Sequence, residues 1–215
     1  MQYTCVIWDF NGTIFDDVQI GIDSLNTLLE RRNLPLVKSK EEYKSWFMFP
    51  IIEGYKKIGF DFDKESYDDV AVEWIKEYLS REHMAKLVPG VVDALEFFKS
   101  LGVKQVILSA AEISMLKRQL LELGVDGYFD EVVGLDNVKA AGKTDIAISW
   151  RKNHSDDKLL FIGDTDHDHE VAVAINADSI LVSAGHQSYE RLERLEPKLV
   201  VLKKPEEIID FIKKQ

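Results

Sequence analysis

Short apolar runs alternate with longer helical patterns along most of this chain, and no other feature limits its fold as strongly. The six strand-like runs are residues 3–9, 104–109, 130–135, 158–164, 179–183 and 198–202. Most of them are continuously apolar, which is typical of parallel strands covered on both faces. Parallel strands need crossover connections, and helices supply them. We therefore expect an α/β fold, a three-layer Rossmann-like sandwich with a parallel sheet.

The segment after Pro89 shows the clearest helical pattern between two such runs. One buried helix face is formed by Val91, Ala94, Leu95, Phe98 and Leu101. Their spacing follows the helical period. Pro89 suits the first turn of this helix and Gly102 suits its end. A second helix near residues 112–123 stops at Gly124 in the same way.

One region breaks the alternation, because it contains helical patterns and almost no strand signal. Its helices are expected over residues 16–32, from Ser39 onwards, and over residues 63–80. An insertion of this size suits a small domain better than a crossover connection. We therefore expect residues 16–85 to form a helical domain inserted into an α/β core domain of residues 1–15 and 86–215.

The composition excludes several classes of partner. The chain has 215 residues, with 38 acidic and 27 basic side chains and a net charge of −11. Such a field repels nucleic acid and anionic membrane surfaces. The single cysteine, Cys5, favours a reducing compartment, and the chain shows neither a signal peptide nor a long apolar span. We expect a cytoplasmic protein, as a monomer or homodimer, with no nucleic-acid or membrane partner.

Polar residues follow three of the expected strands where those strands end. Asp9 and Thr13 follow the first strand, Ser109 ends the second, and an acidic segment at 164–168 follows the fourth. Lys143 begins the helix before that fourth strand. Ligands of open parallel sheets bind at the carboxyl ends of the strands, so these groups are expected to converge. Clustered carboxylates require a cation, and hard oxygen ligands favour Mg²⁺.

Four segments together carry a resemblance to a known family. WDFNGTIFDD (8–17), VILSAAE (106–112), AAGKTD (140–145) and FIGDTDHD (161–168) resemble the four sequential motifs of the haloacid dehalogenase-like (HAD) superfamily. The resemblance covers essentially the whole chain. The helical insertion is similar to the cap domain of the phosphoglycolate phosphatase and β-phosphoglucomutase branch. The resemblance therefore implies a Mg²⁺-dependent phosphatase that acts on a small phosphorylated metabolite.

The resemblance also implies the nucleophile and the metal ligands. Asp9 would attack phosphorus in line and form an aspartyl-phosphate. A Mg²⁺ ion would bridge Asp9 and a phosphate oxygen and offset their repulsion. The other ligands would be the backbone carbonyl of Asn11 and the carboxylate of Asp164. Asp168 would hold metal-bound water, or would orient the metal ligands without contacting the metal itself.

The phosphate-binding groups implied by the resemblance come from three of the four motifs. They are Gly12, Thr13, Ser109, Ala110 and Lys143. The hydroxyls of Thr13 and Ser109, with backbone N–H groups after Asp9, would donate to the phosphate oxygens. Lys143 would balance charge near Asp9 as a point cation and so counts among the catalytic residues.

Asn11 departs from the pattern of the phosphatase branches, which carry there an Asp that acts as general acid and base. An amide cannot shuttle a proton, and general acid–base catalysis is worth ~10²–10⁴-fold. One interpretation is a phosphatase for good leaving groups, such as acyl phosphates, anhydrides and aryl phosphates. In a second, His167, His169 or a cap residue such as Ser39, Tyr43 or a lysine supplies the proton. In a third, the chain is a phospho-ligand-binding sensor with little turnover.

Other members of the superfamily fit the sequence less well. A dehalogenase attacks carbon and has no use for Mg²⁺, so the acidic segment at 164–168 argues against it. A phosphonatase needs a Schiff-base lysine in the cap, where Lys38, Lys40, Lys44, Lys56 and Lys57 have no distinctive context. A mutase usually keeps the general acid, so Asn11 argues against a mutase as well.

Several other residues have both a structural and a functional interpretation. The aromatic stretch 46–50 is expected either in the cap core or as an apolar wall facing the site. Arg31 and Arg32 end a helix, where cations favour the helix dipole, although they could reach an anionic substrate. His186 follows the fifth strand at the ligand edge, where it either touches substrate or is an ordinary loop residue.

Overall fold

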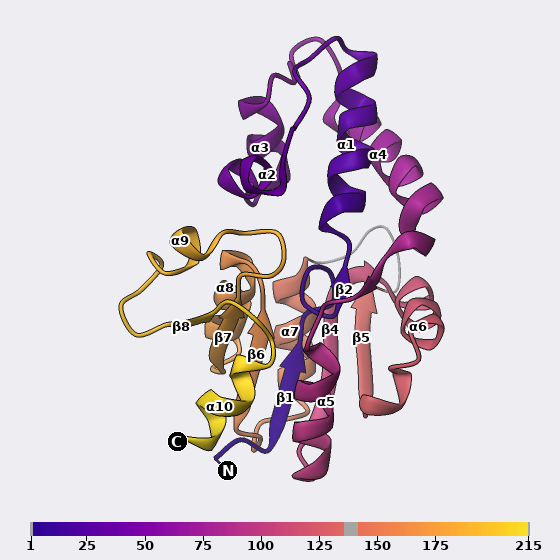
Figure 1. Cartoon of the computed structure of the whole chain (residues 1–215). Helices are drawn as coiled ribbons and strands as arrows, with labels where there is room; N and C mark the ends of the chain where they lie inside the picture. Colours follow the sequence, from indigo (N-terminus) through magenta and orange to yellow (C-terminus); the bar gives the residue numbers. More distant parts are fainter. Residues whose placement is uncertain (1, 136–141, 215) are drawn as a thin grey trace.

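A six-stranded parallel sheet forms the centre of the structure, a computed structural model that describes residues 2–135 and 142–214. Its strands are β1 (Cys5–Trp8), β4 (Lys104–Glu112), β5 (Glu131–Leu135), β6 (Leu159–Gly163), β7 (Asp178–Val182) and β8 (Val200–Leu202). The strand order is β5-β4-β1-β6-β7-β8, and every neighbouring pair is parallel (Figure 1). The first strand in the chain therefore lies in the middle of the sheet, between β4 and β6.

Helices cover both faces of this sheet. One face packs against α5 (Val91–Ser100), α6 (Ile113–Glu122) and α10 (Glu207–Lys213), and the other against α7 (Lys143–Arg151) and α8 (Asp166–Ala174). Side chains of β1 alternate between the layers: Val6 and Trp8 join the first core, and Cys5 and Ile7 join the second. All four are fully buried. A strand buried on both faces is apolar throughout, which explains the continuous run in the sequence.

Four helices form the insertion that rises from one end of the sheet (Figure 1). They are α1 (Val18–Arg31), α2 (Lys40–Trp46), α3 (Ile51–Lys57) and α4 (Tyr67–Arg81). The four helices share an apolar core of their own, centred on Leu25, Leu28 and Leu29 of α1. A two-stranded antiparallel ribbon, β2 (Phe15–Asp16) with β3 (Lys86–Leu87), joins the insertion to the sheet.

The short elements lie in connections. Two 3₁₀ turns, Glu82–Met84 and Asp126–Tyr128, follow α4 and α6, and α9 (Tyr189–Leu192) follows the loop after β7. Among the residues that the structure describes, no helix is both long and apolar enough to cross a membrane.

The expected α/β fold with a parallel sheet and a helical insertion is confirmed. Ser39 begins α2 as expected, because its Oγ accepts a hydrogen bond from the N–H of Glu42 at 3.1 Å. The expectation was wrong in several details: α4 begins at Tyr67 rather than residue 63, and α3 and the β2–β3 ribbon were not expected. Leu101, expected on the buried face of α5, lies after the end of that helix and is exposed. Residues 140 and 141, the first two of AAGKTD, lie outside the described residues.

Candidate active site

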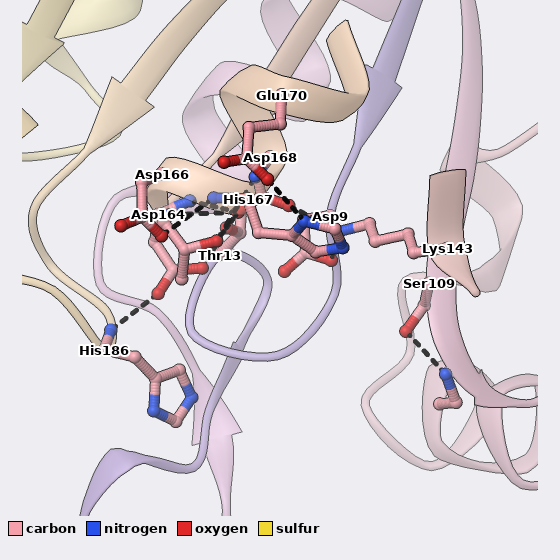
Figure 2. A network of polar contacts seen from close by, with 12 residues as sticks. Asp9, Thr13, Ser109, Lys143, Asp164, Asp166, His167, Asp168, Glu170 and His186 are labelled. Atoms are coloured by element: carbon pink, nitrogen blue, oxygen red, sulfur yellow. Dashed lines mark hydrogen bonds and ion pairs between the residues drawn. The ribbon is translucent and has the colours of Figure 1, made fainter. Parts of the chain in front are cut away.

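The central position of β1, next to β6, brings two of the four motif segments to one edge of the sheet. Asp9 directly follows β1, and its N–H donates to the carbonyl of Ile162 in β6 at 2.8 Å. Asp164 directly follows β6, and α8 begins two residues later. The carboxyl ends of parallel strands meet at one edge, so the side chains after β1 and β6 come together there (Figure 2).

Asp9, Asp164 and Asp168 form a buried carboxylate cluster. One oxygen from each lies within 4.8 Å of the others, and all three side chains are nearly inaccessible to solvent. Lys143, the first residue of α7, inserts its buried ammonium between two of them and donates to Asp9 Oδ1 and Asp168 Oδ1. The convergence expected from the sequence is therefore present in the fold.

Backbone and hydroxyl donors hold the cluster in place. Asp168 Oδ2 accepts the N–H groups of Asp164 at 3.1 Å and Thr165 at 3.0 Å, together with the Thr165 hydroxyl at 2.7 Å. Thr165 is also the N-cap of α8, so one capping box fixes both the helix start and the Asp168 carboxylate. Asp164 accepts the Thr13 hydroxyl at 3.0 Å.

Gly12 lets the loop after β1 pass close to Asp164. Its φ is +77°, in the left-handed region, and a Cβ there would lie 2.4 Å from Asp164 Oδ2. Only glycine therefore fits both the backbone conformation and the space, and the loop carries Asn11 and Thr13 to the cluster.

The cluster is electrostatically unfavourable without a cation. Burial raises the pKa of Asp9 to about 8; Lys143 opposes this shift, and Asp168 adds repulsion. Burial also raises the pKa of Asp164 to about 6. Burial acts the same way on Asp168, but the ammonium of Lys143 holds the pKa of that carboxyl below its usual range. Buried, closely spaced carboxylate oxygens are hard ligands, so the three aspartates could hold a divalent metal ion.

Asn11 points its amide at another carboxylate. Its Nδ2 donates to Asp17 Oδ2 at 2.8 Å and to the Tyr78 hydroxyl at 3.0 Å. Tyr78 donates in turn to the same Asp17 oxygen at 2.7 Å. Asp17 Oδ1 accepts the N–H of Gly12 at 3.1 Å. Both amide hydrogens of Asn11 are therefore engaged.

His186 connects the core to the insertion. Its Nε2 lies 3.2 Å from Asp17 Oδ1, and its Nδ1 lies 3.0 Å from the Tyr43 hydroxyl of α2. Its backbone N–H donates to Asp164 Oδ2 at 2.6 Å. Burial alone lowers the pKa of His186, but the Asp17 carboxylate reverses the shift and raises it to about 9. For Asp17, where burial has the opposite effect, His186 keeps the carboxyl pKa below its usual value.

Two further contacts join the insertion to the loop after β7. Phe47 stacks on the His186 ring with centroids 4.9 Å apart. Lys44 Nζ donates to the carbonyl oxygens of Ser183 at 2.8 Å and Ala184 at 3.2 Å. The insertion is thus closed against the core beside the carboxylate cluster.

Ser109 and Ala110 occupy a different position from the one expected. β4 continues to Glu112, so Ser109 lies within the strand and not at its end, next to a register shift between Leu108 and Glu112. The Ser109 side chain is buried, and its Oγ accepts the N–H of Ala111 at 3.1 Å (Figure 2). No acceptor among the described residues bonds to its hydroxyl hydrogen. Ala110 is exposed.

The other proton-donor candidates are engaged elsewhere. The His167 ring lies 3.1 Å from Glu170 and packs on Phe49 with centroids 5.0 Å apart. The His169 ring lies 2.8 Å from the Ser179 hydroxyl of β7. Neither histidine ring has a hydrogen bond to the described carboxylate cluster.

The aromatic stretch 46–50 fills both of its expected roles, in the cap core and in the wall beside the site. The two arginines fill only a structural one. Trp46 belongs to the core of the insertion, whereas Phe47 and Phe49 contact His186 and His167. Arg31 pairs with Glu77, and Arg32 forms hydrogen bonds with Glu65 and Glu73, all within the insertion. The arginines therefore bind helices together.

Sequence reasoning missed Asp17 and Tyr78 as site residues. The sequence places Asp16 and Asp17 at the start of the helix expected over residues 16–32, and Tyr78 within the helix expected over residues 63–80. The available signal was an amide at position 11 with an acid six residues later, at the entry to the insertion. His186 was recognised only as a residue at the ligand edge, and the partners of its two ring nitrogens lie more than 140 residues away in the sequence.

Comparison with known proteins agrees with this geometry. Residues 6–182 match the family described as haloacid dehalogenase-like hydrolase. A Caldanaerobacter subterraneus protein provisionally named pyrophosphatase PpaX is 26% identical over 203 residues, covering 92% of this chain and 89% of its own length. A Thermotoga maritima phosphorylated carbohydrates phosphatase is 28% identical over 188 residues, covering 86% of this chain and 77% of its own length.

The solved structures agree on the fold. A haloacid dehalogenase-like family protein from Streptococcus pneumoniae superposes with a TM-score of 0.80 at 20% identity, covering 98% of this chain and 99% of the other. The match to the family extends from β1 through β7 and includes all four motifs and the carboxylate cluster. The chain therefore belongs to the haloacid dehalogenase-like hydrolase family.

Proposed function

We propose that this chain is a Mg²⁺-dependent phosphatase that hydrolyses small phosphorylated metabolites with good leaving groups, by phosphoryl transfer to Asp9. The observation that carries the proposal is the cluster of Asp9, Asp164 and Asp168 with Lys143, buried at the carboxyl ends of adjacent parallel strands. The family and the phosphatase names of the relatives support it. A protein that only binds a phosphorylated ligand would have no need for a buried carboxylate directed at phosphorus.

The residues fit a resident Mg²⁺ ion. Asp9 and Asp164 would hold it with the backbone carbonyl of Asn11, and Asp168 would orient its water ligands. When bound, the ion supplies positive charge that keeps Asp9 ionised and screens it from the phosphate. The raised pKa values of Asp9 and Asp164 support a cation at this place.

The chemistry of the chain's own residues has two steps. In the first, a carboxylate oxygen of Asp9 forms a bond to phosphorus while the bond to the leaving-group oxygen breaks and that oxygen takes the electron pair. In the second, a water oxygen forms a bond to phosphorus while the bond between phosphorus and the Asp9 oxygen breaks. Asp9 recovers its carboxylate, and the protons of the water leave with the phosphate or pass to solvent. Lys143, already in contact with Asp9, balances the charge of the transferring group.

Hydroxyl and backbone donors would hold the phosphate. The hydroxyl hydrogen of Ser109, which no described residue accepts, is available for this role. The Thr13 hydroxyl bonds to Asp164 in this structure and would turn towards the substrate when a ligand takes its place. The N–H group of Ala110 completes the proposed set. The N–H of Gly12, expected there from the sequence, donates to Asp17 Oδ1 instead.

Asn11 favours a leaving group that departs without a proton. Its two amide hydrogens are bonded to Asp17 and Tyr78, and an amide does not titrate in the useful range. Acyl phosphates and phosphoanhydrides release weakly basic groups, which removes the need for general acid catalysis. The provisional name of one relative, a pyrophosphatase, supports an anhydride substrate.

Residues 16–85 would act as a cap domain over this site. Tyr43, Lys44 and Phe47 of the insertion already contact the loop after β7, so closure excludes water from the cluster. The aromatic faces of Phe47 and Phe49 would then form part of the wall that selects the leaving group.

The direct test is a rate comparison on acetyl phosphate, p-nitrophenyl phosphate and an alkyl phosphate, with Mg²⁺ and with EDTA. We expect turnover only with Mg²⁺, and acetyl phosphate to exceed the alkyl ester by about 10²-fold or more, the scale of a missing general acid. Preference for the alkyl ester would refute the leaving-group proposal. Absence of turnover on all three, with tight phosphate-ester binding, would favour a sensor.

A further inference from the structure

Asp17 lies where the core and the insertion meet. It directly precedes α1 and follows the β2 strand of the connecting ribbon. Its side chain is buried, and its carboxylate contacts four polar groups from three parts of the chain: the Asn11 amide, the Gly12 N–H, the Tyr78 hydroxyl and the His186 ring. No step of the proposed reaction uses this carboxylate.

The Asp17 carboxylate dictates which residue fits at position 11. A carboxylate only accepts hydrogen bonds, so the atom of residue 11 that lies 2.8 Å from Asp17 Oδ2 must be a donor. The amide nitrogen of Asn11 meets that requirement. An aspartate at position 11 would place a second carboxylate oxygen at this contact, with no positive group between the two.

Asp17 also joins both sides of the insertion to the core. Tyr78 comes from α4, and the Asp17–His186 contact continues to Tyr43 of α2. The same carboxylate therefore fixes the loop after β1, which leads from Asp9, and the two helices that close beside it. Replacing the charge at this point disturbs all three together.

We propose that Asp17 is a positioning residue, whose carboxylate fixes Asn11 and closes the insertion over Asp9, and that residues 11 and 17 form an exchangeable amide–carboxylate pair. This inference rests on the proposed function. It deepens that function because it explains why the site carries an amide at position 11. A carboxylate does lie beside position 11 in this chain, but it is the side chain of Asp17 and not of residue 11 itself.

The count of hydrogen-bond donors and acceptors in the pair predicts that each single substitution is harmful and that the second substitution restores what the first one loses. In Asp17→Asn, an amide nitrogen in place of Oδ2 meets the Nδ2 donor of Asn11, and one in place of Oδ1 meets the Gly12 N–H donor. The native orientation of Asn11 therefore cannot be kept with every contact satisfied, and the charge that faces His186 is lost. In Asn11→Asp, two carboxylates meet. In the double variant Asn11→Asp/Asp17→Asn, the amide of residue 17 donates to the carboxylate of residue 11, and each contact is again satisfied.

The experiment is a double-mutant cycle read by steady-state kinetics on acetyl phosphate with Mg²⁺. We expect each single variant to lose about tenfold or more in kcat/KM, and the double variant to recover to within about threefold of the native value. The matched control is Asp23→Asn on α1, whose carboxylate contacts Gln19 on the surface, and it should behave as the native chain. An unaffected Asp17→Asn variant, or losses that multiply in the double variant, would overturn the proposal.

A second readout separates positioning at the site from mere structural support. The double variant carries a carboxylate at position 11, so its rate on an alkyl phosphate relative to acetyl phosphate should rise by about tenfold or more over the native ratio. A ratio equal to that of the native chain would reduce the pair to structural support and overturn the positioning role.

Failure of the proposed function would be recognised separately, by a native chain with no Mg²⁺-dependent turnover on any panel substrate. The pair would then be tested by thermal unfolding in EDTA, which needs no substrate. Lowered midpoints in both single variants and recovery in the double variant would support the exchangeable pair. Additive lowering would overturn it.

Discussion

Replacing Lys143 with methionine tests the electrostatic account of the carboxylate cluster without using any substrate. The substitution keeps the length of the buried side chain and removes its charge. The ammonium now contacts Asp9 and Asp168, and both are almost inaccessible to solvent. The Lys143→Met variant therefore leaves Asp9 and Asp168 without the cation that they share, beside the Asp164 carboxylate.

Two approaches give the same size of effect. Two unit charges 4.8 Å apart interact by about 3.5 kcal/mol at an effective dielectric constant of about 20, and Lys143 lies closer than that to both Asp9 and Asp168, so the attraction lost at each carboxylate is at least of this size. Removing one partner of a buried ion pair typically costs about 3–5 kcal/mol. For a domain of this size, that loss corresponds to a fall in the unfolding midpoint of roughly 6–20 °C.

The assay is thermal unfolding followed by circular dichroism, at neutral pH, in EDTA and in excess MgCl₂. We expect the large loss in EDTA and a larger stabilisation by Mg²⁺ in the variant than in the native chain, because the metal replaces the missing positive charge. The control is Lys152→Met, an exposed lysine at the end of the same helix, with an expected change below about 1 kcal/mol. A Lys143→Met variant as stable as the native chain in EDTA would refute the reasoning.

Three further predictions concern other parts of the molecule. Burial alone raises the pKa of Glu131, but Lys104 and Trp150 outweigh it and hold the pKa at about 2. The ion pair of Glu131 therefore stabilises the fold fully above pH 4.5, the unfolded pKa of Glu131. This stabilisation is lost as the pH falls towards 2. Glu131→Gln should therefore be less stable than the native chain at pH 7, with the difference in urea unfolding narrowing at acid pH. Leu28→Ala, in the core of the insertion, should cost about 2–5 kcal/mol in guanidinium unfolding. Ser109→Ala should lower kcat/KM on acetyl phosphate by roughly 10- to 150-fold, the value of one hydrogen bond to a charged group, and an unchanged value would exclude Ser109 from phosphate binding.

The sheet could be predicted because its signal is local. Cys5, Ile7 and their neighbours are buried on both faces of β1, and that burial leaves a continuous apolar run in the sequence. Asp9 and Asp164 could be grouped from the sequence on condition that their strands are neighbours, and the strand order β4-β1-β6 meets that condition. Their positions followed from the rule that ligands bind at the carboxyl ends of strands.

The short elements escaped prediction because they depend on tertiary contacts. β2 and β3 are two residues each and pair across the whole insertion, so neither run carries a periodic signal. The seven residues of α3 include Gly54, which lowers helix propensity but lets the Trp46 ring approach within 3.3 Å of a Cβ position. Packing in the insertion, rather than local preference, stabilises this helix.

The polar network around Asp17 shows the same limit for function. Asn11 could be identified from the sequence as an exception to the family pattern, but its consequence depends on a partner six residues away in sequence and on Tyr78 and His186 from other parts of the chain. Composition and spacing cannot reveal such a network. Only the folded structure reveals that the buried Asp17 carboxylate accepts hydrogen bonds from several distant donors.

Mass spectrometry of the protein quenched in acid during turnover of acetyl phosphate tests the central claim most directly. If Asp9 attacks phosphorus, a peptide containing Asp9 carries one additional phosphoryl group, the label requires Mg²⁺, and Asp9→Asn abolishes it. Turnover that persists in Asp9→Asn, or a phosphoryl group found on any other residue, would contradict the account.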